Sequence, residues 1–230
     1  MTGLFMPAPF PKLGSFEWLG EVVGDTTSLY DMAGMNFGTP SSTRLIVGAI
    51  HWEFGSSNRA LSTCTIGGVS ATIIIQDSHT GGITGLGAAI VSAVVPTGDS
   101  GTVSSTYSGG ITGTAVSLFR ANNLVSNTPF DTLEVRGDAD TDINGLIDVP
   151  ERGICLLVGS SSTNGSTANV TLTGADEIYD VNLNTSFGFA GRACSGLTTR
   201  LPAETSRFCR YQFAASNSGA EMMVCTWQMA

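Results

Sequence analysis

Short apolar runs separated by turn residues follow one another along almost the whole chain. The run from Arg44 to Phe54, RLIVGAIHWEF, begins as continuous apolar sequence and ends in alternation, which predicts a buried strand. The run from Cys64 to Gln76 carries Gly67 and Gly68 near its centre, which predicts a hairpin with a tight turn or bulge. No stretch keeps a convincing 3.6-residue apolar period over three turns, so the pattern predicts strands and turns throughout.

Further runs of the same kind bring the expected set to ten or more short strands. The segment 84–96, TGLGAAIVSAVVP, fits helix or strand, and its β-branched residues and terminal proline favour strand. Other strands are expected at 101–109, 112–120, 153–160, 168–174, 176–183, 206–214 and 220–229. Many short strands joined by Gly, Ser, Asn and Asp turns predict an all-β protein, an antiparallel β-sandwich or jelly roll.

The first residues differ from the rest of the chain. MTGLFMPAPFPKLG alternates proline with apolar residues and lacks a basic n-region, which favours an extended N-terminal arm over residues 1–14 rather than a secretory signal. The apolar side chains expected to lie on a neighbouring subunit or on the chain's own body are Leu4, Phe5, Met6, Phe10 and Leu13. No internal repeat or long linker is evident, so residues 15–230 are expected to form a single β-sandwich domain.

Composition narrows the class of protein. Charged residues make up 13% of the chain, against about 25% in an average soluble domain. A surface of Ser, Thr, Asn and Gly is typical of β-rich extracellular or virion proteins. The net charge of −9 repels phosphate backbones, so nucleic acid is not an expected partner. No run approaches 18 apolar residues, so membrane insertion is not expected either.

Four arginines near the C-terminal end stand out against the acidic balance, with only Glu204 opposing them. They are Arg192, Arg200, Arg207 and Arg210. Arginine is favoured at protein interfaces because its planar fork makes several hydrogen bonds. An interface, scattered surface arginines and an anion site are the three interpretations that the sequence leaves open.

The five cysteines give no zinc pattern, because none forms C-x-x-C and no histidine lies at metal spacing from them. Cys155, inside the apolar run GICLLVG, is expected to be a small buried hydrophobe. Cys194 and Cys209 could pair across a loop, although an odd and low count argues against a disulfide scaffold.

The stretch with the most candidate metal ligands is DADTDINGLIDVPE, residues 138–151. From Asp140 it has the spacing of a twelve-residue calcium loop, with oxygen ligands at positions 1, 3, 5, 7, 9 and 12 and glycine at position 6. The predicted ligands are Asp140, Asp142, Asn144, Leu146, Asp148 and Glu151. The flanking segments look like strands rather than helices, and Pro150 disfavours an exiting helix. A solvated acidic turn is therefore the competing interpretation.

Other candidate chemistry is sparse. Asp77, Ser78 and His79 are adjacent, but a catalytic triad needs convergence in space rather than in sequence. No G-x-S-x-G pattern occurs in a strand–turn–helix setting. His51 lies on a predicted strand, where a hydrogen-bonded sheet residue is the ordinary interpretation. An enzyme is therefore not expected.

Five motifs follow one another between Ser42 and Asp180. They are STRLIVGAIHWE, STCTIGGVSATIIIQ, TGTAVSLFRANNL, IDVPERGICLLVGSSS and NVTLTGADEIYD. In this order they resemble a group of small virion structural proteins of tailed bacteriophages. The chain departs from that group at VPERG, where Glu151 and Arg152 replace smaller residues, and in the acidic segment just before it.

The resemblance implies a β-sandwich that decorates the capsid or forms part of the tail or a fibre, without a bound cofactor beyond the calcium considered above. The expected function is that of a non-enzymatic structural component of a virion, with a decoration or cement protein favoured over a tail or fibre component. Such a protein is made in the host bacterial cytoplasm and located in the extracellular particle. Its expected partners are other virion proteins and other copies of itself.

A host-glycan or receptor-binding β-sandwich, a lectin-like fibre module, is the alternative class. A sugar site needs an exposed aromatic platform beside groups that bond hydroxyls. The candidate platforms are Trp18, Trp52, Trp227 and Tyr107. Each is expected in the core instead, because aromatic side chains dominate burial.

Overall fold

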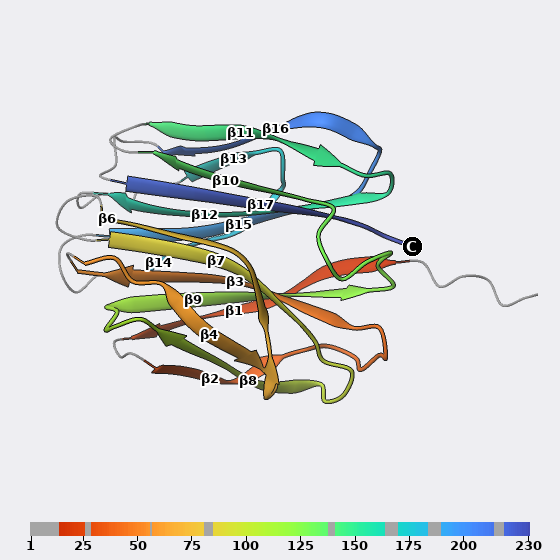
Figure 1. Ribbon diagram of the computed structural model, residues 1–230, viewed down its shortest axis with the longest axis horizontal. Coiled ribbons are helices and arrows are strands. Elements are labelled where there is room, and N and C mark those ends of the chain that lie inside the picture. The colour runs from red at the N-terminus through yellow and green to blue at the C-terminus, as the bar shows by residue number, and fades with distance from the viewer. Residues whose placement is uncertain are drawn as a thin grey trace, which may run out of the picture.

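The computed structural model describes residues 14–25, 29–55, 57–80, 85–137, 141–163, 170–183, 190–213 and 219–230. Their regular structure is β-strand throughout, arranged in four antiparallel sheets that stack as layers (Figure 1). The predicted all-β fold is confirmed. Within these described ranges, no helix is long and apolar enough to cross a membrane.

The first nine strands form a two-sheet unit that we call the first roll. Its larger sheet has the strand order β1-β9-β3-β7-β6 and its smaller sheet the order β2-β8-β4-β5, which is the jelly-roll arrangement. The strands are β1 (Ser15–Asp25), β2 (Leu29–Asn36), β3 (Leu45–Phe54), β4 (Leu61–Ile66), β5 (Val69–Ser70), β6 (Thr72–Thr80), β7 (Gly85–Val94), β8 (Ser100–Tyr107) and β9 (Gly113–Asn122).

The remaining eight strands form the second roll. Its larger sheet has the order β10-β17-β12-β15-β14 and its smaller sheet the order β11-β16-β13. The strands are β10 (Asp131–Gly137), β11 (Asp142–Val149), β12 (Gly153–Thr163), β13 (Val170–Thr173), β14 (Glu177–Asn182), β15 (Ala190–Leu201), β16 (Glu204–Phe213) and β17 (Gly219–Gln228).

The two rolls share one strand order. The larger sheets of the two rolls have the same order of strands. Taken in that order, β10, β17, β12, β15 and β14 of the second roll correspond to β1, β9, β3, β7 and β6 of the first. Strands β2, β8 and β4 correspond in the same way to β11, β16 and β13. The prediction of one sandwich without an internal repeat is therefore corrected to two sandwiches of repeated topology. The repeat lies in strand pairing, which leaves little trace in the sequence.

The larger sheets of the two rolls pack face to face, and we call this interface the seam. In Figure 1 the seam runs between the layer of β10, β17, β12 and β15 and the layer of β7, β3 and β9, with the two smaller sheets outermost. A continuous apolar core fills it, built from side chains such as Leu45, Val47, Ile154, Leu156 and Trp227. Separate cores lie between the larger and smaller sheet of each roll. The rolls therefore form one body.

The layering explains the hydrophobic pattern of β3. All ten of its residues are buried, because one face packs against the smaller sheet of the first roll and the other face packs into the seam. A strand covered on both faces reads as a continuous apolar run rather than as an alternation. Strand β10, at the edge of its sheet, alternates between exposed and partly buried positions instead.

Two local predictions are confirmed. Gly67 and Gly68 form the two-residue turn between β4 and β5, with φ of 60° and 79°, a conformation that favours glycine. The described part of the ambiguous segment 84–96, residues 85–96, contains strand β7 and no helix.

Arg44 lies immediately before β3 and fixes the loops at one end of the first roll. Its guanidinium is fully buried and donates hydrogen bonds of 2.6–3.2 Å to backbone carbonyls. The acceptors are the carbonyls of Phe37, Gly38, Val95, Thr97 and Gly98. A buried cation needs such partners, since its desolvation is otherwise expensive.

All five cysteines are buried free thiols. Cys155 is a buried core residue, as predicted. Cys194 and Cys209 lie in the same core of the second roll but are not joined, so the pairing considered from the sequence is not formed.

Candidate functional site

The acidic segment predicted to wrap around calcium is largely a strand. Residues 142–149 form β11, which pairs antiparallel with β16, and Asp140 lies outside the described residues. A strand rises about 3.3 Å per residue, so the backbones of Asp142 and Asp148 are about 20 Å apart. Asn144 and Leu146 lie between them in the ladder, opposite Arg210 and Phe208.

The acidic side chains of this segment have separate partners within the chain. Asp142 forms an ion pair with Arg210, and Asp148 accepts a hydrogen bond of 2.8 Å from the Ser206 amide. Glu151 accepts one of 3.2 Å from the Ala203 amide. In the described ranges, no group of three or more His, Cys, Asp or Glu residues is placed to hold a metal ion. The described part of the segment therefore does not adopt the twelve-residue calcium arrangement, because a paired strand spreads its ligands along a line.

The four C-terminal arginines do not form one basic patch. Arg192 is buried and ion-paired with Asp180, and Arg210 is paired with Asp142. Arg207 donates to Glu204 at 2.8 Å and to the Gly174 carbonyl at 2.8 Å. Three of the four charges are thus balanced inside the second roll.

Arg200 differs from the other three because it is exposed and has a left-handed φ of 61°. With Arg152, whose φ is 55°, it lines a small hollow of about 250 Å³ beside Gly14 and Met229. The first described residue and the last two residues of the chain all line this hollow. Figure 1 shows the start of β1 close to the C-terminal end of the chain. Of the predicted interface arginines, only Arg200 is placed beside the start of the body.

The arm residues Leu4, Phe5, Met6, Phe10 and Leu13 lie outside the described residues. Their role at an interface stays a prediction.

His51 is confirmed as a hydrogen-bonded sheet residue. Its Nδ1 lies 2.8 Å from Oγ of Ser160, and its Nε2 lies 2.6 Å from the hydroxyl of Tyr179. Burial lowers the pKa of His51 from 6.5 to about 3, so the ring is neutral at physiological pH and one nitrogen donates while the other accepts. These contacts join β3 of the first roll to β12 and β14 of the second.

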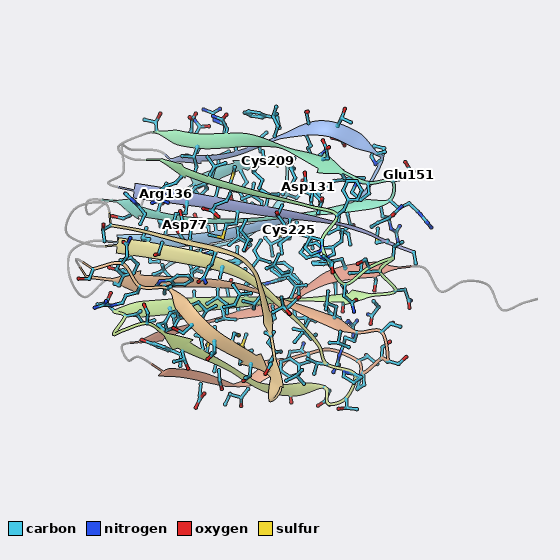
Figure 2. All side chains as sticks on the ribbon, viewed as in Figure 1. Asp77, Asp131, Arg136, Glu151, Cys209 and Cys225 are labelled. Atoms are coloured by element: carbon cyan, nitrogen blue, oxygen red, sulfur yellow. The ribbon has the colours of Figure 1, made fainter. Side chains whose placement is uncertain are left out.

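Two carboxyl groups are also buried in the seam. Glu53 and Glu221 are almost fully excluded from solvent, and neither oxygen of Glu221 makes a hydrogen bond to a described residue. Burial raises the pKa of Glu53 to about 7 and raises the pKa of Glu221 well above its usual range. Nearby, Arg136 of β10 forms an ion pair of 2.9 Å with Asp77 of β6, across the two rolls (Figure 2).

Three of the four candidate sugar platforms are core residues, as expected. Trp52, Trp227 and Tyr107 are buried, whereas Trp18 is exposed at the edge strand β1 and donates its indole N–H to Ser117.

An exposed aromatic that the sequence did not suggest, Phe130, lines an open hollow between the two rolls, which we call the seam groove. This seam groove has a volume of about 570 Å³. One wall is formed by residues 72–74 and 92–94 of the first roll, and the other by residues 127–132, which lead into β10 of the second. Phe130 is 59% exposed. The groove is thus an open part of an otherwise filled interface.

Neither models of known protein families nor curated protein sequences match the chain. The fold and the chemistry of its surfaces therefore carry the functional argument.

One signal in the sequence could have indicated that Phe16 and Phe130 correspond. Ser15–Leu19 reads SFEWL and Pro129–Leu133 reads PFDTL, so both rolls open their first strand with the pattern Phe, acid, any residue, Leu. Recognising this short repeat would have paired Phe16 with Phe130. The buried carboxyls of the seam have no such signal, because their burial depends on the packing of the two rolls.

Proposed function

We propose that this chain is a non-enzymatic structural component of a bacteriophage virion that assembles onto neighbouring capsid or tail subunits. The observation that carries the proposal is the pair of jelly rolls fused face to face around one core. Jelly rolls are common in viral capsid and lectin domains. Because a fold alone does not fix function, the resemblance of the motifs in 42–180 to virion proteins supports the structural role over the other uses of the fold.

The two outermost faces of the body differ in a way that suits one-sided assembly. On the outer sheet of the second roll, Leu146 and Phe208 lie directly opposite each other and are 57% and 45% exposed. On the outer sheet of the first roll, the neighbouring strands instead carry a paired Asp31 and Ser104, joined by a hydrogen bond. An exposed apolar pair favours contact with another protein, whereas hydroxyl and carboxyl groups favour water.

We therefore place the virion contact on the outer face of the β11-β16-β13 sheet, together with the predicted arm. A decoration or cement protein is favoured over a tail or fibre component, since this arrangement leaves the hydroxyl-rich sheet of the first roll facing solvent. Multiple copies on a symmetric particle would bind with higher avidity than a single contact allows.

The test is to add purified protein to particles that lack it and to measure co-sedimentation. Saturable binding to capsids at a fixed number of copies per particle supports a decoration protein. Binding to isolated tails instead would support the tail placement. Binding to host cells with no binding to either particle part would contradict the structural role.

A further inference from the structure

The seam groove lies where the two rolls differ at equivalent positions. Phe16, near the start of β1, is paired with Ala121 of β9. Phe130 directly precedes β10 and its amide donates to the Thr226 carbonyl at 2.7 Å, which places it beside Trp227 of β17. Because β1 and β9 correspond to β10 and β17, the two phenylalanines occupy the same place in their rolls.

The environments of these two rings are opposite. Phe16 is only 7% exposed, and its ring centroid lies 5.7 Å from that of Trp227 and 6.0 Å from that of Phe119. It fills its end of the seam. Phe130 keeps most of its surface open, and beside it lies the groove of about 570 Å³. That volume falls within the range of small-molecule sites, which often lie between packed units.

The polar groups around Phe130 are mainly oxygen-bearing and neutral or negative. Hydroxyl groups come from Thr72, Ser92 and Thr128, and an amide comes from Asn127. None of the residues lining the groove, all of which belong to the described ranges, is Lys, Arg or His. An anionic ligand would therefore find no countercharge there.

Asp131 is the one carboxylate of the groove, and it is held in a fixed orientation. Its Oδ1 accepts a hydrogen bond of 2.8 Å from the Thr132 amide, and its Oδ2 accepts one of 2.9 Å from the Asp148 amide. Each carboxylate oxygen can accept further hydrogen bonds. Asp131 is thus a prepositioned acceptor one residue from an exposed ring.

The acidic character continues on the far side of Phe130. A second hollow of about 490 Å³ shares Phe130 and is lined by Asp148, Glu151 and Glu204. The negative charge on both sides disfavours phosphorylated, sulfated or carboxylated ligands. Among carbohydrates it leaves the neutral ones, which donate many hydrogen bonds and have an apolar face.

We propose that the seam groove binds a neutral saccharide, with the apolar face of one sugar ring stacked on Phe130 and its hydroxyls donating to Asp131. The aromatic ring contributes apolar contact with a defined geometry, and the fixed carboxylate orients the hydroxyl groups. A free oligosaccharide and a cell-surface glycan present the same chemistry. The proposal is independent of whether the protein sits on the head or the tail of a particle.

The test has a soluble and an immobilised arm. The wild-type protein is applied to an array of immobilised neutral, anionic and peptide ligands, and neutral hits are then titrated as free oligosaccharides by calorimetry. We expect binding to neutral glycans in the array. Binding in both arms indicates that a free oligosaccharide suffices, whereas binding only to immobilised polysaccharide indicates a surface glycan, and both results support the site.

Two variants locate the binding. Phe130→Ala should weaken it by about tenfold or more, because it removes the stacking surface. Val94→Trp, from the opposite wall, should abolish it by filling the groove. Val23→Ala removes an exposed apolar side chain on β1, at the opposite edge of the sheet from β6, and should leave affinity unchanged. Thermal melting of each variant confirms that it is folded.

Three results would overturn the proposal. They are a wild-type protein that binds no neutral glycan at millimolar concentration, binding restricted to anionic glycans or peptides, and neutral-glycan binding that survives both Phe130→Ala and Val94→Trp in folded protein.

Discussion

His51 and Ser160 occupy the same position in the two rolls and touch each other across the seam. The His51 Nδ1 lies 2.8 Å from the Ser160 Oγ, although 109 residues separate them in the sequence. His51 pairs with Ala88 of β7, and Ser160 pairs with Ala193 of the corresponding strand β15. The contact joins β3 directly to β12, the corresponding strand of the second roll.

This pair predicts a large effect of a single substitution. His51→Ala should lower the free energy of unfolding by about 3 kcal/mol, because it leaves the Ser160 and Tyr179 hydroxyls buried without their partner and opens a cavity. Urea denaturation at pH 7 measures the change. Val125→Ala, at an exposed position, is the matched control and should change stability by less than about 0.5 kcal/mol. An equal loss of stability in His51→Ala and Val125→Ala would show that the contacts of His51 across the seam do not stabilise the fold.

Glu53 predicts how stability depends on pH between about 4.5 and 7. Its folded pKa of about 7 lies above the usual value of 4.5, so the folded state binds the extra proton between those values. Protonated Glu53 contributes about 3 kcal/mol to the free energy of unfolding below pH 4.5. This contribution is lost as the pH rises through 7. Glu53→Gln should remove that part of the slope and be more stable than wild type at pH 8. Burial also raises the pKa of Glu221. The stability of the Glu53→Gln variant should therefore still decrease with rising pH because of Glu221.

The measurement is a series of urea denaturation curves from pH 5 to pH 9. His51 acts in the opposite direction on the acid side, because its folded pKa of about 3 lies below 6.5 and its contribution is lost as the pH falls below 6.5. His51 is present in both proteins, so its contribution cancels when wild type and Glu53→Gln are compared. Curves for the two proteins that stay parallel between pH 5 and pH 7 would refute the role of Glu53.

The strand geometry of 142–149 predicts that calcium does not stabilise the protein. A site filled at one hundred times its dissociation constant would add about 2.7 kcal/mol to the free energy of unfolding and raise the melting midpoint by several degrees. We expect equal midpoints in millimolar calcium and in EDTA. A rise in midpoint that grows with calcium concentration and disappears in Asp142→Asn would restore the calcium interpretation.

The apolar pair on the outer sheet of the second roll predicts an assembly defect without loss of folding. Leu146→Ser combined with Phe208→Ser gives this face the hydroxyl character found on the outer face of the first roll. Binding to particles should fall by at least about tenfold while the melting midpoint changes little, since both side chains are largely exposed. Val69→Ser, on the outer sheet of the first roll, is the control. An equal loss of binding in the control would move the contact away from the second roll.

The strands and turns of this fold could be predicted from the sequence because they depend on local patterns. The continuous apolar run of β3 and the Gly67-Gly68 turn are visible without a structure. The acidic segment shows the limit of such patterns. Its ligand spacing fits a calcium loop, but pairing with β16 extends it, and that pairing depends on residues more than 50 positions away.

The doubling of the fold was hidden for a similar reason. Equivalent positions such as His51 and Ser160, or Ala115 and Glu221, differ in chemistry, so their correspondence rests on register rather than on identity. The groove at Phe130 was hidden more deeply, because it arises where one roll fills the seam and the other does not. Burial of Phe16 against Trp227 and exposure of Phe130 are consequences of packing alone.

Electron cryo-microscopy of the intact particle is the decisive test of whether this double jelly roll is a structural subunit of a virion, as we propose. The prediction is density for four stacked β-layers at symmetry-related positions on the capsid, with the sheet of Leu146 and Phe208 facing the neighbouring subunit and the sheet of Asp31 and Ser104 facing solvent. A particle whose complete density leaves no place for this fold in the head, the tail or the fibres would contradict the claim.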